Sequence, residues 1–305
     1  MAEKDVTEKI LESYNDVFAD IVNVLLFGGR QVVAPDELED QAPRAYYKAD
    51  GKVRELERDV AKRWKKGSIR VACIGLENQT RADPAMPLRV MGYDGAEYRA
   101  QLAEGSHYPV VTLVLYFGHQ KHWDAPLRLK ECLTIPPAFE PFVSDYKVNL
   151  FEIAYLTREQ VTLFQSDFGI VADYFVQKRE KGADGEYEPD PRQIRHVQET
   201  LQLLSVMTRD HRFEDAYNDI HTDDMEGGPY TMCEFLDKVE NKGLEQGLQQ
   251  GLKLGLSEGR QEAKQEIALT LKGMGMSVET IAEAVKVSVE TVQQWLAPGG
   301  HRPTA

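Results

Sequence analysis

The 305-residue chain has no apolar run long enough to cross a membrane. It also has few cysteines. Cys73, Cys132 and Cys233 stand alone, and neither they nor the seven histidines show the spacing of a metal site. The opening residues, MAEKDVTEK, are charged and lack the pattern of a signal peptide. These absences argue against a membrane protein, and they predict reduced thiols and a cytoplasmic location.

Positive charge is scarce as well, because 36 Lys and Arg residues face 50 Asp and Glu residues and the formal net charge is −14. This excludes a globally basic nucleic-acid-binding protein. Residues 44–70 are the exception, with ten positive and four negative side chains, a balance of +6. Such a segment is either a solvated face or the cationic surroundings that a phosphate-backbone substrate needs.

The most informative stretch is Ile69–Thr80, IRVACIGLENQT, which predicts a strand because it is mostly apolar, largely β-branched and free of proline. Its end is polar. Glu77 and Gln79 are two residues apart, so in an extended chain both side chains point to the same side. Such groups are costly to bury without partners. Their position therefore indicates a functional site.

Asp59 lies upstream at the end of another short segment of strand length. Asp59, Glu77 and the backbone carbonyl of Asn78 could together hold Mg²⁺ or Mn²⁺, which prefer oxygen ligands. In that interpretation, Gln79 would orient the attacking water or a phosphate oxygen. The residues alone slightly favour another interpretation, a salt-bridge network between these carboxylates and neighbouring arginines.

Positive side chains flank this group. Arg58 and Lys62 lie beside Asp59 in the sequence, and we expect them to neutralise the charge of a bound phosphate.

The rest of the first 230 residues predicts an α/β unit. Residues 30–50 are expected to be irregular because they contain two prolines. In Leu88–Leu102, a predicted helix, four residues could form a buried stripe: Leu88, Met91, Tyr98 and Leu102. The other predicted helices are 8–27, 157–180 and 190–217, and the other predicted strands are 110–117 and 148–156.

The C-terminal part carries glycine at every fourth position from 243 to 259, and leucine follows each of the first four. Each glycine costs roughly 1 kcal/mol within a helix. We therefore expect either a soft connector or, with slight preference, a helix on which a second copy of the chain packs closely.

Two short helices are predicted beyond this segment, opening at Ser277 and Ser288 and resembling a helix-turn-helix. Residues 243–296 hold five positive and seven negative side chains, which favours a small oligomerisation unit over DNA binding. The predicted division of the chain is a nuclease-like domain at 1–230, a glycine-repeat helix at 231–262 and a small helical unit at 263–305.

The string RDVAKRW…IGLENQT…MPLRVMGYD, followed by QL and an apolar strand, resembles the recombination-promoting nuclease/putative transposase (Rpn) family. That family belongs to the PD-(D/E)XK nuclease superfamily. The resemblance covers roughly residues 8–180, and the glycine-repeat tail is also typical of the family. It implies a restriction-endonuclease-like core, with a mixed central sheet flanked by helices, and an all-α C-terminal tail.

The resemblance also assigns roles to residues. It implies that Asp59 is the motif aspartate, Glu77 the second acid, and Gln79 the residue at the usual lysine position. Arg89 and Tyr93 match the arginine and tyrosine of the helix after the motif, where they would contact substrate phosphate. Glutamine can donate and accept hydrogen bonds but supplies no positive charge.

The implied function is a Mg²⁺-dependent DNA endonuclease (Mn²⁺ is the other candidate ion) with a role in DNA recombination and DNA as its partner. Two alternatives remain open at this point. One is a catalytically weak nuclease fold that acts as a DNA- or protein-binding module. The other is an interaction protein whose main functional element is the glycine-repeat helix.

Overall fold

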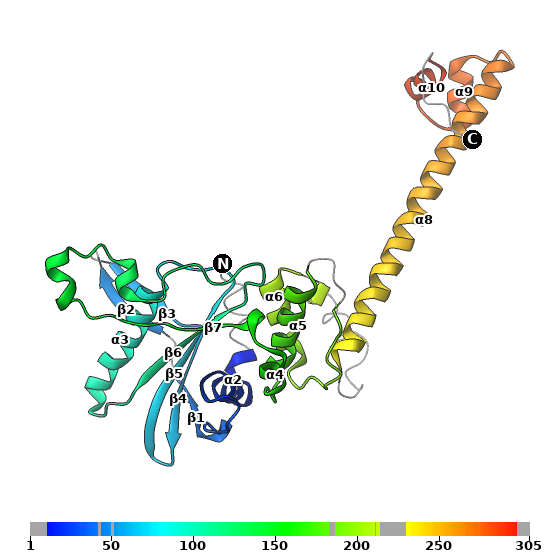
Figure 1. Cartoon of the computed structure of the whole chain (residues 1–305). Helices are drawn as coiled ribbons and strands as arrows, with labels where there is room; N and C mark the ends of the chain where they lie inside the picture. The colour runs from blue at the N-terminus through cyan, green and yellow to red at the C-terminus, as the bar shows by residue number, and fades with distance from the viewer. Residues whose placement is uncertain are drawn as a thin grey trace. The chain divides into compact units, whose positions relative to one another are not determined.

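The computed structural model describes residues 11–41, 44–49, 52–182, 187–210, 212–213 and 230–297 (Figure 1). The chain divides into two compact units, Met1–Val239 and Glu240–Ala305. Each unit is described by itself below.

The first unit is built on a five-stranded mixed sheet in the order β1-β4-β5-β6-β7. Pairing is antiparallel from β1 to β5 and parallel from β5 to β7. The strands are β1 (Leu38–Asp40), β4 (Val60–Lys66), β5 (Ile69–Gln79), β6 (Val110–Tyr116) and β7 (Asn149–Glu152). The predicted mixed sheet flanked by helices is confirmed.

A separate antiparallel hairpin consists of β2 (Arg44–Ala49) and β3 (Lys52–Glu57). The expectation that residues 30–50 are irregular is therefore wrong in part, because β1 and β2 both lie there. Pro35 stands outside the strands, where it does not interrupt a ladder, and Pro43 lies outside the described residues.

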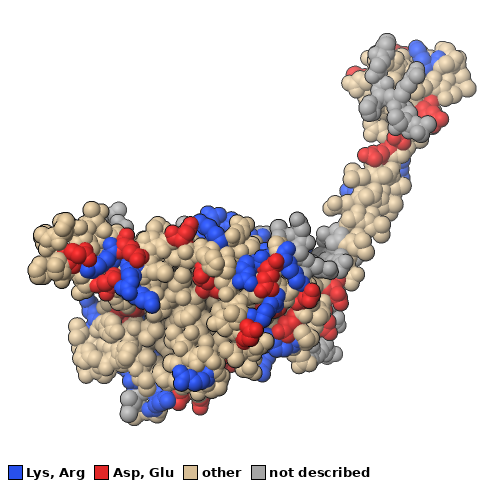
Figure 2. Space-filling view, in the orientation of Figure 1, with Lys and Arg blue, Asp and Glu red and all other residues tan. Residues whose placement is uncertain are grey.

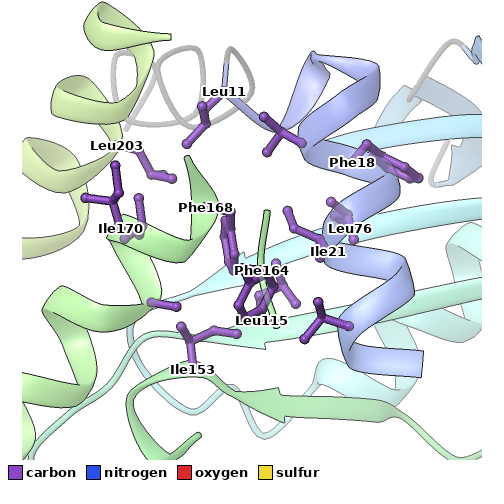
Figure 3. Close-up of a cluster of buried hydrophobic side chains, with 14 of the residues drawn as sticks. Leu11, Phe18, Ile21, Leu76, Leu115, Ile153, Phe164, Phe168, Ile170 and Leu203 are labelled. Carbon is purple, nitrogen blue, oxygen red and sulfur yellow. The ribbon is translucent and has the colours of Figure 1, made fainter. Parts of the chain in front are cut away.

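Helices cover both faces of the sheet (Figure 1). On one face, α2 (Asn15–Phe27) packs with α5 (Phe168–Lys181) and α6 (Val197–Thr208) against the apolar side chains of β5 and β6. Figure 3 shows this core, in which Phe18, Leu76 and Phe168 come from a helix, a strand and a second helix. Gly28 ends α2 with φ of 64°, a left-handed conformation that favours glycine.

The other face is covered by α3 (Met86–Glu104), which connects the parallel strands β5 and β6. The predicted helix is confirmed, but the predicted buried stripe is wrong. All four of its residues are exposed: Leu88, Met91, Tyr98 and Leu102. The buried face of α3 instead includes three polar side chains, Asp94, Glu97 and Gln101. These find hydrogen-bond partners on the sheet and on Tyr108.

Two predicted helices are shorter than expected. The predicted helix at 157–180 is divided into α4 (Arg158–Thr162) and α5, because the backbone leaves the helix between them. There Asp20 accepts hydrogen bonds from two backbone N–H groups of the linking residues. The predicted helix at 190–217 is confirmed only as α6, and residues 214–217 lie outside the described residues. The predicted strand at 148–156 continues from β7 into a 3-10 turn, Ile153–Tyr155.

The second unit contains most of α8 (Met232–Gly273), followed by α9 (Val278–Val285) and α10 (Val289–Leu296). The predicted caps are confirmed, because Ser277 and Ser288 each accept a hydrogen bond from the backbone of their helix. A small core joins the three helices, and it consists of Ala268, Ile281, Ala282, Val285 and Val292. Of the helices in the described residues, none has an apolar stretch sufficient to span a membrane.

Candidate functional site

The β4–β5 hairpin brings Asp59 beside Glu77. Val60 pairs with Leu76, so Asp59, in the bend just before β4, lies opposite Glu77. A carboxylate oxygen of Asp59, Oδ2, accepts a hydrogen bond of 2.6 Å from the backbone N–H of Asn78. The N–H and C=O of a strand residue point to the same side of the strand. The Asn78 carbonyl therefore lies on the side of β5 that faces Asp59.

Glu77 is a buried carboxylate whose side chain is 2% exposed, and it faces α3. Its Oε1 accepts a short hydrogen bond from Nη2 of Arg89, and a second of 3.2 Å from Nε2 of Gln79. Arg89 is held further by Asp83, 3.0 Å from Nη1, and by the Tyr93 hydroxyl, 3.1 Å from Nη2. The buried negative charge of Glu77 is thus balanced by a positive one.

The pKa values of Tyr93 and Arg89 are both raised. Burial, reinforced by the negative charge of Glu77, raises the pKa of Tyr93 to about 12, so its hydroxyl stays protonated. Burial by itself would lower the pKa of Arg89, but the charge of Glu77 outweighs it and the pKa is raised. Arg89 is therefore a permanent cation and Tyr93 a permanent hydroxyl at any ordinary pH.

Asn78 points to the opposite face of the sheet from Glu77 and Gln79, as alternation along a strand requires. Its Nδ2 donates a hydrogen bond of 2.6 Å to Oε2 of Glu12, and both residues are buried. Glu12 lies in the helical turn before α2. Sequence reasoning missed this carboxylate, because nothing in its neighbourhood indicates that the chain returns to the end of β5.

Two residues predicted to bind phosphate, Arg58 and Lys62, have side chains that are buried in other interactions. Lys62 is fully buried on the α2 face of the sheet, where Nζ pairs with Asp40 and lies 5.8 Å from the centre of the Phe18 ring. Since Glu77 faces the other side, Lys62 is not available to a phosphate there.

Arg58 is buried against α3, where its Nη2 lies 2.9 Å from Oδ1 of Asp94. The guanidinium passes directly over Gly75, at which a Cβ atom would come within 2.8 Å of the arginine Cδ. Glycine is therefore required in this strand for the close approach. Arg58 acts as a structural cation.

The positive charge of residues 44–70 is partly neutralised by carboxylates from other segments. Arg63 and Arg70 both pair with Glu104 of α3, and Lys65 pairs with Glu39 of β1. The face of the first unit in Figure 2 likewise shows Lys and Arg interspersed with Asp and Glu. The part of the predicted cationic surroundings that the structure describes is therefore largely a set of ion pairs.

The donor set fits a hard divalent cation. Within the described residues, no three His, Cys, Asp or Glu side chains gather as a metal site. Asp59 and Glu77 each offer carboxylate oxygens, and Asn78 a backbone carbonyl, at the same end of the β4–β5 hairpin. Oxygen is the donor that Mg²⁺ and Mn²⁺ prefer, although Oε1 of Glu77 is engaged by Arg89.

Residues 65–177 match the model of a protein family described as "Putative transposase, YhgA-like". The match covers about a third of the chain, and over this segment the chain is similar to that family. The match begins within β4 and ends within α5, so it includes Glu77, Gln79, Arg89 and Tyr93, while Asp59 lies just before it. The family resemblance drawn from the sequence motif is confirmed over this segment. No curated protein and no solved structure matches the chain.

Proposed function

We propose that the first unit is a PD-(D/E)XK-type nuclease that hydrolyses DNA phosphodiester bonds with the help of Mg²⁺ or Mn²⁺. The observation that carries the proposal is the hydrogen bond from the Asn78 amide to Asp59, which holds that carboxylate at the end of β5, next to Glu77 in the strand. Membership of residues 65–177 in a transposase-like family supports it, because transposition requires phosphodiester chemistry on DNA.

Each residue of the site has a separate role in the proposed reaction. Asp59, Glu77 and the Asn78 carbonyl would hold the ion, whose chemistry is to polarise the phosphate and acidify a water molecule. Gln79, whose amide nitrogen lies 3.2 Å from Glu77, can hold the attacking water through its amide oxygen. An amide cannot accept the water's proton at neutral pH, so we expect slower cleavage than with a lysine at this position.

Arg89 supplies the positive charge that Gln79 lacks. Its side chain is 37% exposed, so the guanidinium can contact a phosphate while remaining beside Glu77. The Tyr93 hydroxyl, which accepts hydrogen bonds from Arg89, fixes the direction of the guanidinium. We therefore assign Arg89 to the scissile phosphate and Tyr93 to the positioning of Arg89.

A second candidate function is a DNA- or protein-binding module with little or no catalysis. The observation that favours it is the ion pair between Arg89 and Glu77, which already balances the buried carboxylate without a metal ion.

A plasmid assay separates the two candidates. Supercoiled DNA is incubated with the chain and Mg²⁺ or Mn²⁺, alongside Asp59→Ala, Glu77→Ala and the control Asp124→Ala, which removes an exposed carboxylate of a surface ion pair. We expect the wild type and the control to nick the plasmid, and the two site variants to do so roughly a hundredfold more slowly. Binding without nicking would favour the second candidate, and equal nicking by all four proteins would contradict the proposal.

A further inference from the structure

The second unit contains a hollow of about 550 Å³ between α8 and α10. Its wall includes three cations, one aromatic ring and several hydroxyl or amide groups. The lining residues are Lys253, Leu256, Ser257, Arg260, Gln261, Lys264, Val287, Thr291 and Trp295. None of the nine is acidic.

This distribution of charge is unusual for the segment. Residues 243–296 hold five positive and seven negative side chains, yet three of the five cations line the hollow and none of the carboxylates does. At about 100° per residue, Lys253, Arg260 and Lys264 fall within about 40° of one another on the helix. The carboxylates of this part of α8 lie on the opposite side: Glu258, Glu262 and Glu266. One face of α8 is therefore cationic, although the segment as a whole holds more negative than positive side chains.

No described carboxylate neutralises the cations of the hollow. Among the side chains described in residues 230–297, neither Lys253 nor Arg260 forms an ion pair with a carboxylate, and both are exposed. Lys264 donates a hydrogen bond of 3.3 Å from Nζ to the backbone carbonyl of Lys286 and keeps its charge. A hollow with three cations and no anion favours a ligand that carries negative charge.

The Trp295 side chain in the wall of the hollow indicates which kind of anionic ligand would bind there. Trp295 is half-buried and packs against the small core of the unit, so the core holds its indole ring in place while part of the ring faces the hollow. Aromatic rings bind nucleobases by stacking, and nearby Lys and Arg side chains follow the phosphates. Thr291 and Gln261 add groups that can hydrogen-bond to a base or a sugar.

We propose that this hollow binds a single strand of nucleic acid, with a base on Trp295 and the adjoining phosphates on Lys253, Arg260 and Lys264. The site differs from the DNA contact of a helix-turn-helix, in which the second helix would present Glu290, Thr291, Gln293 and Gln294, because of these four only Thr291 lines the hollow. It is also independent of the proposed nuclease site, which lies in the other unit.

The test uses the full chain without divalent ions, so that binding is measured whether or not the protein cleaves DNA. The probe is a fluorescein-labelled 12-nucleotide oligothymidylate, and its anisotropy is followed at several salt concentrations. Arg260→Gln is compared with Lys272→Gln, because Lys272 lies on the same helix but does not line the hollow. Trp295→Phe keeps a ring in the core and reduces the stacking surface.

We expect Arg260→Gln to weaken binding about threefold to tenfold and to reduce the slope of log K against log salt by about 0.7, the value for one phosphate contact on a single strand. Trp295→Phe should weaken binding with little change in slope, and Lys272→Gln should bind like the wild type. Equal affinity and slope for Arg260→Gln and Lys272→Gln would overturn the proposal.

Two further results would also overturn it. If thymidine monophosphate displaces the probe at the same nucleotide concentration as unlabelled oligothymidylate, the hollow binds free nucleotides and not a strand. If Arg260→Gln lowers the mass of the protein in solution, a second copy of the chain occupies the hollow.

Discussion

At the scale of single residues, the most important contact of the site is that between Arg89 and Glu77. If the first unit is the proposed nuclease, Gln79 stands where the nuclease motif has lysine, so the strand itself supplies no cation. The structure places a cation there from α3 instead, in direct contact with Glu77 and braced by Asp83 and Tyr93. A missing charge at one position is thus replaced by a charge from another element.

Replacing Arg89 by glutamine should lower the free energy of unfolding by about 1–3 kcal/mol. Removal of one partner of a buried pair usually costs more, but Arg89 is partly exposed and water can screen the remaining charge. Urea unfolding measures the change. Arg99→Gln, an exposed arginine on the same helix, is the control and should change stability by less than about 0.5 kcal/mol. Equal losses in both variants would show that the ion pair contributes nothing.

The sequence predicted the pair of acids but not their full surroundings. Asp59 and Glu77 could be brought together because a short hairpin fixes which residues face each other. Glu12 could not be found, because its contact with Asn78 joins positions far apart in the chain. Arg58 and Lys62 were assigned to phosphate because charge in a sequence does not show burial.

At the scale of elements, α3 is attached to the sheet through polar contacts. Asp94 of α3 pairs with Arg58 and accepts a hydrogen bond of 2.6 Å from the hydroxyl of Thr112 on β6, and another from Tyr146. This explains how four apolar residues of α3 can face outward: Leu88, Met91, Tyr98 and Leu102. Sequence periodicity assumes that the apolar side of a helix is the buried one, and here a satisfied polar network reverses that relation.

Asp94→Ala should destabilise the first unit by about 3–5 kcal/mol, because it leaves the Arg58 guanidinium buried without a counter-charge. The matched control is Asp124→Ala, whose ion pair with Lys121 is exposed and is expected to contribute little to stability. Both values can be measured by urea unfolding. A loss below about 1 kcal/mol in Asp94→Ala would contradict this description of the α3–sheet contact.

We propose that α8 joins two or more copies of the chain. No other group lies within 4 Å of a Cβ position at any of the four described glycines of the repeat in α8, namely Gly247, Gly251, Gly255 and Gly259. Several neighbouring leucines are more than half exposed, including Leu248 at 73% and Leu252 at 64%. A second helix lying on this surface would cover the leucines and approach closely at the glycines.

Light scattering should therefore give a mass of at least a dimer for the full chain, and a monomer for Leu248→Glu/Leu252→Glu. Truncation to residues 1–240 should have the same effect. Leu102→Glu is the control, because Leu102 is a comparably exposed leucine on α3. A monomeric wild type, or an unchanged mass in the double variant, would exclude self-association through α8.

At the scale of the whole molecule, the fold class was predictable and the domain boundaries stay predictions. The mixed sheet could be inferred because apolar runs and turn residues mark strands and helices locally. The C-terminal end of the first unit is harder to infer, because the boundary between Val239 and Glu240 falls inside α8. A helix that belongs to two units gives no sequence signal at the boundary. The cytoplasmic location also stays a prediction.

The excess of negative charge sets a further condition on the function of the chain. A protein with a net charge of −14 repels DNA at long range, so any DNA contact must come from local groups. Among the described residues, the candidate for DNA contact in the first unit is Arg89. In the second unit it is the cationic face of α8. We expect binding to be weak at high salt and to depend on these few side chains.

In the proposed function, Asp59 and Glu77 hold a divalent metal ion. Electron paramagnetic resonance of free Mn²⁺ tests it directly, by titrating Mn²⁺ into the wild type, Asp59→Ala, Glu77→Ala and the control Asp124→Ala. We predict that the wild type and the control bind Mn²⁺, that Mg²⁺ displaces it, and that both site variants lose this binding. A wild type that binds no Mn²⁺, or site variants that bind it as the control does, would contradict the claim.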